Sequence, residues 1–224
     1  MNVRKIFANR RAAGQELAME LEKYGFEKPV VLALPRGGVP VAFEVARRLK
    51  APLDLVMVGK IGAPGHSEYA IGAVVDGENP QIVLDREAAD RSGADDAYIS
   101  RMKARKLAEI KRRRSAYGGS QTLDLEGRTA IIVDDGIATG LTVSAALNGL
   151  TKARPAKTVL AVPVAAPESL RSLAPLCDQT VCLLSPRAFY AVGAHYDDFG
   201  ETSDAEVITL LSCANAPRKQ GHPI

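Results

Sequence analysis

Short apolar runs alternate along the chain with stretches whose apolar residues recur at helical spacing. The runs are continuous, as in strands buried on both faces of a parallel sheet, and they cover 29–34, 53–58, 129–133, 158–164 and 180–184. The stretches predict helices at 11–24, 39–50, 140–153 and 167–174. This alternation is typical of an α/β fold with a wound, mainly parallel β-sheet and flanking helices.

The interval 59–128 is much longer than an ordinary crossover between parallel strands, so it must hold structure of its own or a mobile loop. Its pattern predicts a hairpin with strands at 69–75 and 81–84 that turns at Asp76-Gly77, and then a helix over 95–116. We therefore expect an insertion between the second and third strands of the sheet.

Composition limits the class of protein. The 224 residues, 46% of them hydrophobic and 25% charged, suffice for one α/β domain with a sizeable core, and no apolar run reaches the ~20 residues of a membrane helix. The net charge of +3 does not by itself indicate nucleic acid. Cys177, Cys182 and Cys213 form no C-x-x-C pair, which favours small buried side chains in a reducing compartment. Because no apolar stretch follows the basic first residues, we expect a cytoplasmic protein.

The segment Ile131–Thr142, IIVDDGIATGLT, carries the most chemistry. An apolar strand delivers two carboxylates, Asp134 and Asp135, to its C-terminal end, and a loop of small and hydroxylated residues then leads into a helix. The free N–H groups and positive end of that helix suit a phosphate, whereas the carboxylates suit sugar hydroxyls or a divalent cation. The alternative is purely structural: the two acids end a strand and Thr139 caps a helix.

This segment resembles the phosphoribosyl pyrophosphate (PRPP) motif of type I phosphoribosyltransferases, in which four apolar and two acidic residues precede a loop ending in Thr-Gly-x-Thr. The resemblance implies that Asp134 and Asp135 hold the 2- and 3-hydroxyls of the ribose. It implies a magnesium ion held mainly by PRPP, with the same two carboxylates as candidate ligands. The loop residues that would bind the 5-phosphate are Gly136, Ile137, Ala138, Thr139, Gly140 and Thr142.

Two further pieces fall where that family binds the leaving diphosphate. Pro35-Arg36-Gly37-Gly38 follows the first predicted strand, at the position of the family's pyrophosphate loop, where the peptide bond before the residue at Arg36 is often cis. The resemblance implies that Arg36 and the backbone N–H of Gly37 face the diphosphate, although Arg-Gly-Gly alone is also a common turn. Lys60 lies in a stretch that resembles a bacterial subfamily of predicted phosphoribosyltransferases. It either neutralises the diphosphate or is an ordinary surface lysine.

Four of the eleven aromatic residues crowd into eleven positions after the last predicted strand: Phe189, Tyr190, Tyr196 and Phe199. In the resembling family a small hood that recognises the nucleobase is built partly from this region. The resemblance implies Phe189, Tyr190 and Tyr196 as base-binding residues that stack on a planar base, and a local aromatic core is the alternative. The predicted divisions are a single domain over 1–213, a lid over 59–128, a hood over 185–201 and a flexible tail over 214–224.

The resemblance predicts a phosphoribosyltransferase that uses PRPP and magnesium to transfer phosphoribose to a nitrogenous acceptor such as a nucleobase, with release of pyrophosphate. Homodimers are frequent in that family. Ala138 stands where hypoxanthine-guanine enzymes have an aspartate, so a 6-oxopurine acceptor is disfavoured. A dinucleotide-binding oxidoreductase is excluded because no G-x-G-x-x-G follows the first predicted strand.

A second class of function stays open because of the charge on the last predicted helix of the insertion. Between Arg101 and Arg114 there are eight basic residues and one acid, Glu109. This run is a solvated helix face, a lid that attracts the polyanionic PRPP, or a patch that binds nucleic acid. The last interpretation belongs to a regulator that senses PRPP or a nucleotide and binds nucleic acid or a protein.

Overall fold

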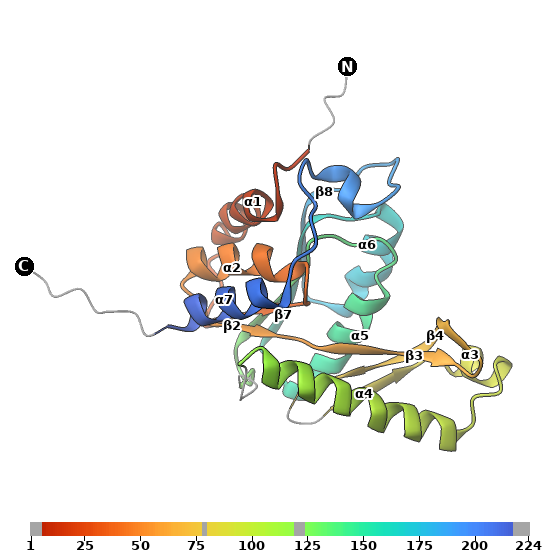
Figure 1. Ribbon diagram of the computed structural model, residues 1–224. Coiled ribbons are helices and arrows are strands. Elements are labelled where there is room, and N and C mark those ends of the chain that lie inside the picture. Colours follow the sequence, from red (N-terminus) through yellow and green to blue (C-terminus); the bar gives the residue numbers. More distant parts are fainter. Residues whose placement is uncertain (1–5, 78–79, 119–123, 217–224) are drawn as a thin grey trace, which may run out of the picture.

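Five parallel strands form the central sheet of the computed structural model, which describes residues 6–77, 80–118 and 124–216 (Figure 1). Their order across the sheet is β2-β1-β6-β7-β8, so the chain winds in both directions from β1 and β6 at its centre. The strands are β1 (Pro29–Ala33), β2 (Leu53–Leu55), β6 (Thr129–Val133), β7 (Lys157–Val164) and β8 (Gln179–Leu184). The wound parallel sheet predicted from the sequence is confirmed.

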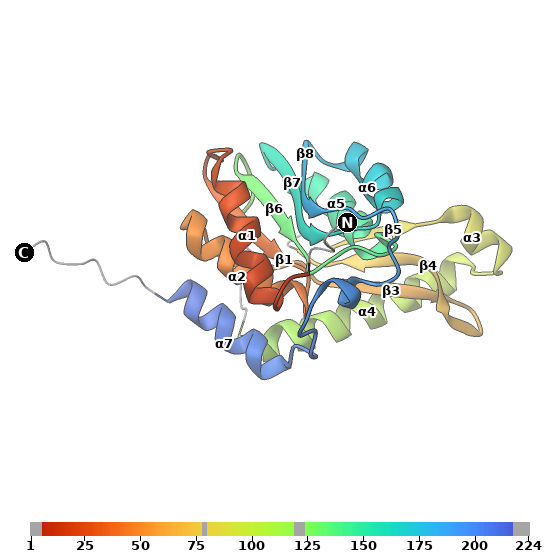
Figure 2. The same cartoon turned by 90° about the horizontal axis from the view of Figure 1, so that it is seen from above.

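Helices cover both faces of this sheet (Figures 1 and 2). One face carries α1 (Arg10–Glu22), α2 (Gly38–Leu49) and α7 (Asp204–Asn215), and the other carries α5 (Leu141–Leu150) and α6 (Pro167–Leu173). Because both faces are covered, the strands are apolar throughout, and all five residues of β6 are buried.

Alternation along the strands divides the core into two halves. In β6, Ile131 and Val133 join the cluster beneath α1 and α2, whereas Ala130 and Ile132 join the cluster beneath α5. Successive side chains of a strand point to opposite faces, so one apolar run supplies both clusters. Burial of both faces fixes the register of β6 and, with it, the position of the residues that follow Val133.

The insertion forms a second sheet, antiparallel and three-stranded, in the order β3-β4-β5. Its elements are β3 (Val58–Ala63), β4 (His66–Val75), β5 (Gln81–Leu84), α3 (Arg86–Arg91) and α4 (Asp96–Ala116). Helices α3 and α4 pack on one face of this sheet, around Ile61, Ile71 and Val74. The opposite face packs against α5, where Val75 lies against Gly149.

Three sequence predictions need correction. The run 53–58 is not one strand, because the chain leaves the central sheet after Leu55 and β3 begins at Val58. The pairing with β1 ends where the N–H of Val56 donates to the carbonyl of Ala33, because the next donor along β1 would be the nitrogen of Pro35, which carries no hydrogen. The expected two-stranded hairpin also gains β3 as a third strand, and the predicted helix 140–153 ends at Leu150, followed by a 3-10 turn over Thr151–Ala153.

The two ends of the described chain join the hood and the sheet edge. Phe7 forms a β-bridge with Tyr196, which brings the start of the chain against residues 185–201. Helix α7 continues to Asn215, whose side-chain amide donates to the carbonyl of Leu53, so 214 and 215 belong to the folded body. The remainder of the predicted tail, 217–224, lies outside the described residues. In the described ranges, no helix is both long enough and apolar enough to cross a membrane.

Candidate functional site

The two predicted acids lie at the C-terminal end of β6, at the centre of the sheet. The carboxylate of Asp134 accepts the backbone N–H of Asp135 at 2.9 Å. Arg10 donates its Nε–H to Oδ2 of Asp135 at 2.7 Å, and the Tyr196 hydroxyl donates to the backbone carbonyl of Asp135 at 2.5 Å. Each acid is therefore held in a defined orientation.

Burial shapes the electrostatics of this pair. Burial raises the pKa of Asp134 well above its usual range, and the neighbouring charge of Asp135 raises that pKa further. Burial likewise raises the pKa of Asp135, against the opposing effect of the Arg10 guanidinium. A group that donates hydrogen bonds or carries positive charge beside the acids would favour their ionised forms. Such a site suits sugar hydroxyls or a cation.

The predicted pyrophosphate loop touches the acid pair directly. A Cβ atom on Gly37 would stand 2.2 Å from Oδ2 of Asp135, and one on Gly38 would stand 2.8 Å from the backbone carbonyl oxygen of Val133. Only glycine leaves room for this approach. The peptide bond between Pro35 and Arg36 is cis, which confirms the sequence expectation.

Arg36 faces carboxylates of the C-terminal segment. It forms an ion pair with Glu201, and its Nη1 lies 3.8 Å from Oδ1 of Asp204. The Tyr117 hydroxyl donates to the same oxygen of Asp204 at 2.7 Å. The Arg36 side chain is 37% exposed, so the guanidinium remains accessible from solvent.

The loop after the acids is anchored to the neighbouring strand. Ile137 donates its N–H to the carbonyl of Val164 and accepts from the N–H of Ala166, and the Ser169 hydroxyl donates to the carbonyl of Ala138. Gly140 precedes α5 with φ of +74°, in the left-handed region, where a Cβ would also stand 3.0 Å from Leu173. The free N–H groups at the N-terminus of α5 therefore lie directly after a fixed loop. Free N–H groups at a helix N-terminus commonly bind anions.

Other predicted residues lie farther from the acids or are covered. Lys60 is exposed on β3, outside the central sheet. Its cross-strand neighbour is Ala73, and both residues lie on the face of the second sheet that is turned towards α5. Tyr196 is 6% exposed, and its ring packs between Phe7 and Phe199, so it belongs to the core of the hood. Tyr190 is 86% exposed. Phe189, the third predicted base-binding residue, stacks on His195, with 5.5 Å between ring centroids.

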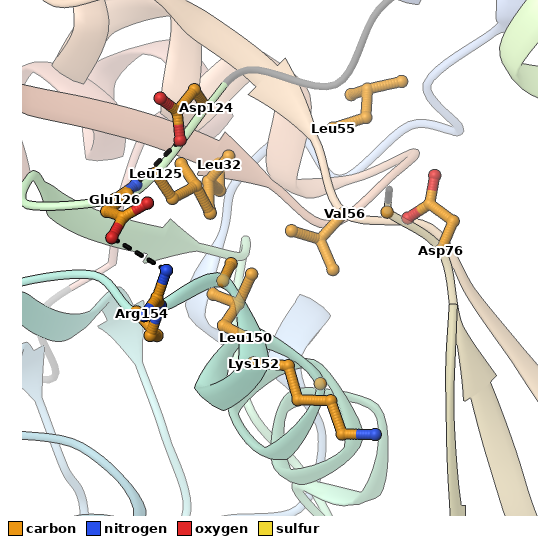
Figure 3. A pocket seen from close by; sticks show the side chains of 13 residues that line it. Leu32, Leu55, Val56, Asp76, Asp124, Leu125, Glu126, Leu150, Lys152 and Arg154 are labelled. Atoms are coloured by element: carbon orange, nitrogen blue, oxygen red, sulfur yellow. Dashed lines mark hydrogen bonds and ion pairs between the residues drawn. The ribbon is translucent and has the colours of Figure 1, made fainter. Parts of the chain in front are cut away.

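A cavity of about 210 Å³ lies at the far end of α5 from the acid pair (Figure 3). Its apolar walls include Leu32 and Val56, and the ion pair between Glu126 and Arg154, 2.9 Å long, stands at its rim. Its lining includes Gly77 and Asp124, which lie next to residues 78–79 and 119–123 that the structure does not describe. It is separate from the residues that the sequence motif brings together.

Arg10 and Glu201 lie outside the motifs that predict the site. Arg10 contacts Asp135 from 125 residues away, and Glu201 pairs with Arg36 from 165 residues away. In the structure Arg10 is the first residue of α1, where a positive charge is unfavourable against the helix dipole, but the predicted helix begins at 11, so the sequence provides no such signal. Glu201 gives no signal either.

The structure thus brings together an acid pair at the tip of the central strand, a glycine loop against those acids and an anchored loop at a helix N-terminus, an arrangement whose chemistry suits a phosphorylated sugar. The chain belongs to the phosphoribosyl transferase domain family, whose model matches residues 3–178. The family and fold class expected from the sequence are thus confirmed.

Two relatives extend the comparison. The chain is 42% identical over 212 residues to a Mycobacterium tuberculosis protein named "Putative phosphoribosyl transferase Rv0571c", covering 94% of this chain and 47% of that one. It therefore spans about half the length of the curated relatives it matches. The crystal structure of the protein TT1426 from Thermus thermophilus is similar with a TM-score of 0.80 and 45% identity, over 92% of this chain and 97% of that one.

Proposed function

We propose that the protein transfers phosphoribose from PRPP to a nitrogenous acceptor, a nucleobase in the first instance, and releases pyrophosphate. The observation that carries the proposal is the contact between two predicted subsites: Gly37 of the pyrophosphate loop lies against the carboxylate of Asp135. A ribose held at the acids would then have its C1 substituent beside the loop that receives the diphosphate.

The reaction breaks the bond between C1 of the ribose and the diphosphate oxygen, and the electron pair leaves with the diphosphate. Positive charge develops on the sugar ring, a nitrogen lone pair of the acceptor forms the new bond to C1, and the proton that this nitrogen carried leaves to the diphosphate or to water. Asp134 and Asp135 orient the ribose and stabilise the positive charge that develops on its ring. Arg36 and the N–H of Gly37 stabilise the negative charge of the diphosphate. The loop 136–142 anchors the 5-phosphate. No covalent nucleophile of the protein is needed.

The residues present fit a magnesium ion held mainly by the substrate. Among the described residues, no three His, Cys, Asp or Glu side chains gather as a metal site, and the acid pair offers two carboxylates at most. Asp134 and Asp135 would supply the protein's share of the ligands. Bound magnesium would neutralise charge on the departing diphosphate.

The acceptor side of the site is proposed from the hood. Residues 185–201 lie next to the acids through Tyr196, and the exposed Tyr190 together with Phe189 offers rings for a planar base. Ala138 supplies no carboxylate at the position where hypoxanthine-guanine enzymes have an aspartate for the ring proton of a 6-oxopurine. Insertion 59–128 is the candidate lid, because PRPP must be shielded from water during transfer.

The direct test is pyrophosphate release with PRPP, magnesium and a panel of purine, pyrimidine and other nitrogenous acceptors. We expect at least one acceptor to accelerate release, with a matching nucleotide product. If magnesium-dependent PRPP binding persists while no acceptor accelerates release, a PRPP-sensing regulator with this fold is favoured instead. Absence of PRPP binding contradicts both.

Replacing Gly37 with alanine separates binding from folding. Gly37 has helical dihedral angles, φ −60° and ψ −33°, so the backbone accepts alanine, but the new Cβ requires the Asp135 carboxylate to move. We expect Gly37→Ala to weaken PRPP binding about tenfold and to change the free energy of unfolding by less than about 1 kcal/mol. Calorimetric titration and urea unfolding measure the two effects. Unchanged PRPP affinity would show that the contact between loop and acid is irrelevant to binding.

A further inference from the structure

Arg10 is fixed by three kinds of contact at the edge of the proposed site. Its Nε lies 2.7 Å from Oδ2 of Asp135, and its Nη1 donates to the carbonyl of Gly200 at 2.6 Å. The guanidinium carbon lies 3.8 Å from the centroid of the Phe199 ring. The side chains of Arg10 and Asp135 are only 13% and 14% exposed, so this ion pair is largely withdrawn from water.

The stability of helix α1 does not explain why position 10 is an arginine. Arg10 is the first residue of α1, where positive charge is unfavourable against the helix dipole, and Asn9 already caps the helix by accepting from the N–H of Ala12. The neighbouring Arg11 behaves as an ordinary surface residue, since its side chain is 60% exposed and pairs with Glu44. The contacts of Arg10 are instead directed to Asp135 and to residues 199–200 of the hood.

We propose that Arg10 is a positioning residue for ribose binding, which holds the Asp135 carboxylate in the orientation that accepts the sugar hydroxyls. This role rests on the proposed function. A carboxylate can accept several hydrogen bonds, and Nε of Arg10 engages Oδ2. With the backbone carbonyl of Asp135 bound by Tyr196, the acid is oriented before substrate arrives. A preoriented group loses less conformational entropy on binding.

The opposite role makes the opposite prediction. If Arg10 were a counter-ion that PRPP must displace from Asp135, its removal would tighten PRPP binding. One feature favours positioning: Arg10 is itself held by the carbonyl of Gly200 and by the Phe199 ring, so it is fixed on the hood side of the contact with Asp135. The direction of the change in affinity therefore decides between the two roles.

The test is calorimetric titration of the full chain with PRPP and magnesium. We expect Arg10→Gln to bind PRPP about tenfold more weakly than the wild type, and Arg10→Lys, which can still donate to Asp135, to fall between them. In the Asp135→Asn background, Arg10→Gln should have less than about a twofold further effect, because its role acts through that carboxylate. Arg11→Gln is the matched control and should bind as the wild type does.

Each outcome bears on the role of Arg10. Equal affinity of Arg10→Gln and the wild type, tighter binding by Arg10→Gln, or a tenfold loss that persists in the Asp135→Asn background would each overturn the positioning role while leaving the proposed function intact. Failure of the wild type to bind PRPP would instead reject the proposed function, and the positioning role with it.

Discussion

Asp134→Asn and Asp135→Asn are each expected to weaken PRPP binding at least tenfold, or by about 1.4 kcal/mol or more. Asparagine preserves the size of the side chain but removes the charge and one acceptor oxygen. At Asp135 the change also removes the ion pair with Arg10, whose guanidinium would be left without that anion in a largely buried position. At Asp134 the backbone N–H of residue 135 can still find an amide oxygen, so the loss there should reflect the ligand more directly.

The matched control for this pair is Asp178→Asn. Asp178 is exposed, lies just before β8 at the opposite end of the sheet from the acids, and accepts the N–H of Thr158. All three variants should be compared by titration with PRPP and magnesium after thermal unfolding has shown that they fold. If both site variants fold and bind as tightly as Asp178→Asn and the wild type, the assignment of the ribose site is wrong.

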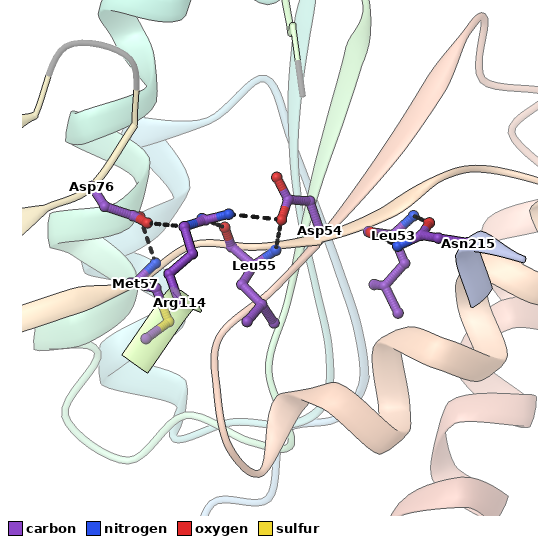
Figure 4. A network of polar contacts seen from close by, with 7 residues as sticks. All are labelled: Leu53, Asp54, Leu55, Met57, Asp76, Arg114 and Asn215. Atoms are coloured by element: carbon purple, nitrogen blue, oxygen red, sulfur yellow. Dashed lines mark hydrogen bonds and ion pairs between the residues drawn. The ribbon is translucent and has the colours of Figure 1, made fainter. Parts of the chain in front are cut away.

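Arg114→Met is expected to cost about 3–5 kcal/mol of folding stability, the largest effect we predict outside the site. Arg114 on α4 reaches the junction between the insertion and the central sheet (Figure 4). It lies 3.0 Å from Oδ1 of Asp54 on β2 and 2.7 Å from Oδ2 of Asp76 after β4, with 12% of its side chain exposed and 10% of each acid's. Methionine fills much of the space but leaves two buried carboxylates without this cation.

The loss should depend on pH. Burial raises the pKa of Asp76 in the folded protein, and Arg114 opposes that rise. Without Arg114 the pKa of Asp76 rises further, so the folded state binds more protons than the unfolded state over a wider pH range. Stability therefore falls as the pH rises through that range. The difference between Arg114→Met and the wild type should therefore be larger at pH 7 than near pH 4.

Arg105→Met is the control on the same helix. Arg105 is 69% exposed and pairs with Glu109, a surface contact whose loss should change stability by less than about 1 kcal/mol. Urea unfolding of both variants at the two pH values gives the comparison. A free energy of unfolding for Arg114→Met within about 1 kcal/mol of the wild type would contradict the structural role of this network.

The basic run also shows why local sequence could predict the helix but not the role of each arginine. Its composition is that of a solvated helix, and Arg105 and Lys106 indeed pair with Glu109 on the surface. Arg114 is indistinguishable in the sequence from its neighbours, yet its partners Asp54 and Asp76 are 60 and 38 residues away. The same arginine donates to the carbonyl of Leu55, and nothing in the run 53–58 itself shows that partner.

The candidate site was predictable to the extent that its residues are consecutive. The strand Thr129–Val133 matches its prediction because every residue is buried and the following acids end the apolar run. The loop and the acids come from one segment whose chemistry is local. Arg10 and Glu201 join the site only through the folding of α1 and the hood, and the covered position of Tyr196 depends on packing against Phe7. No short-range pattern encodes these contacts.

The central claim is that the tip of β6 holds ribose 5-phosphate. A crystal structure of the protein with magnesium and PRPP, or with ribose 5-phosphate, tests it most directly. We predict ribose hydroxyls within hydrogen-bond distance of Asp134 and Asp135, and the 5-phosphate against the N–H groups of 136–142. An ordered ligand bound elsewhere, with the two acids still engaged only by protein groups, would contradict the account.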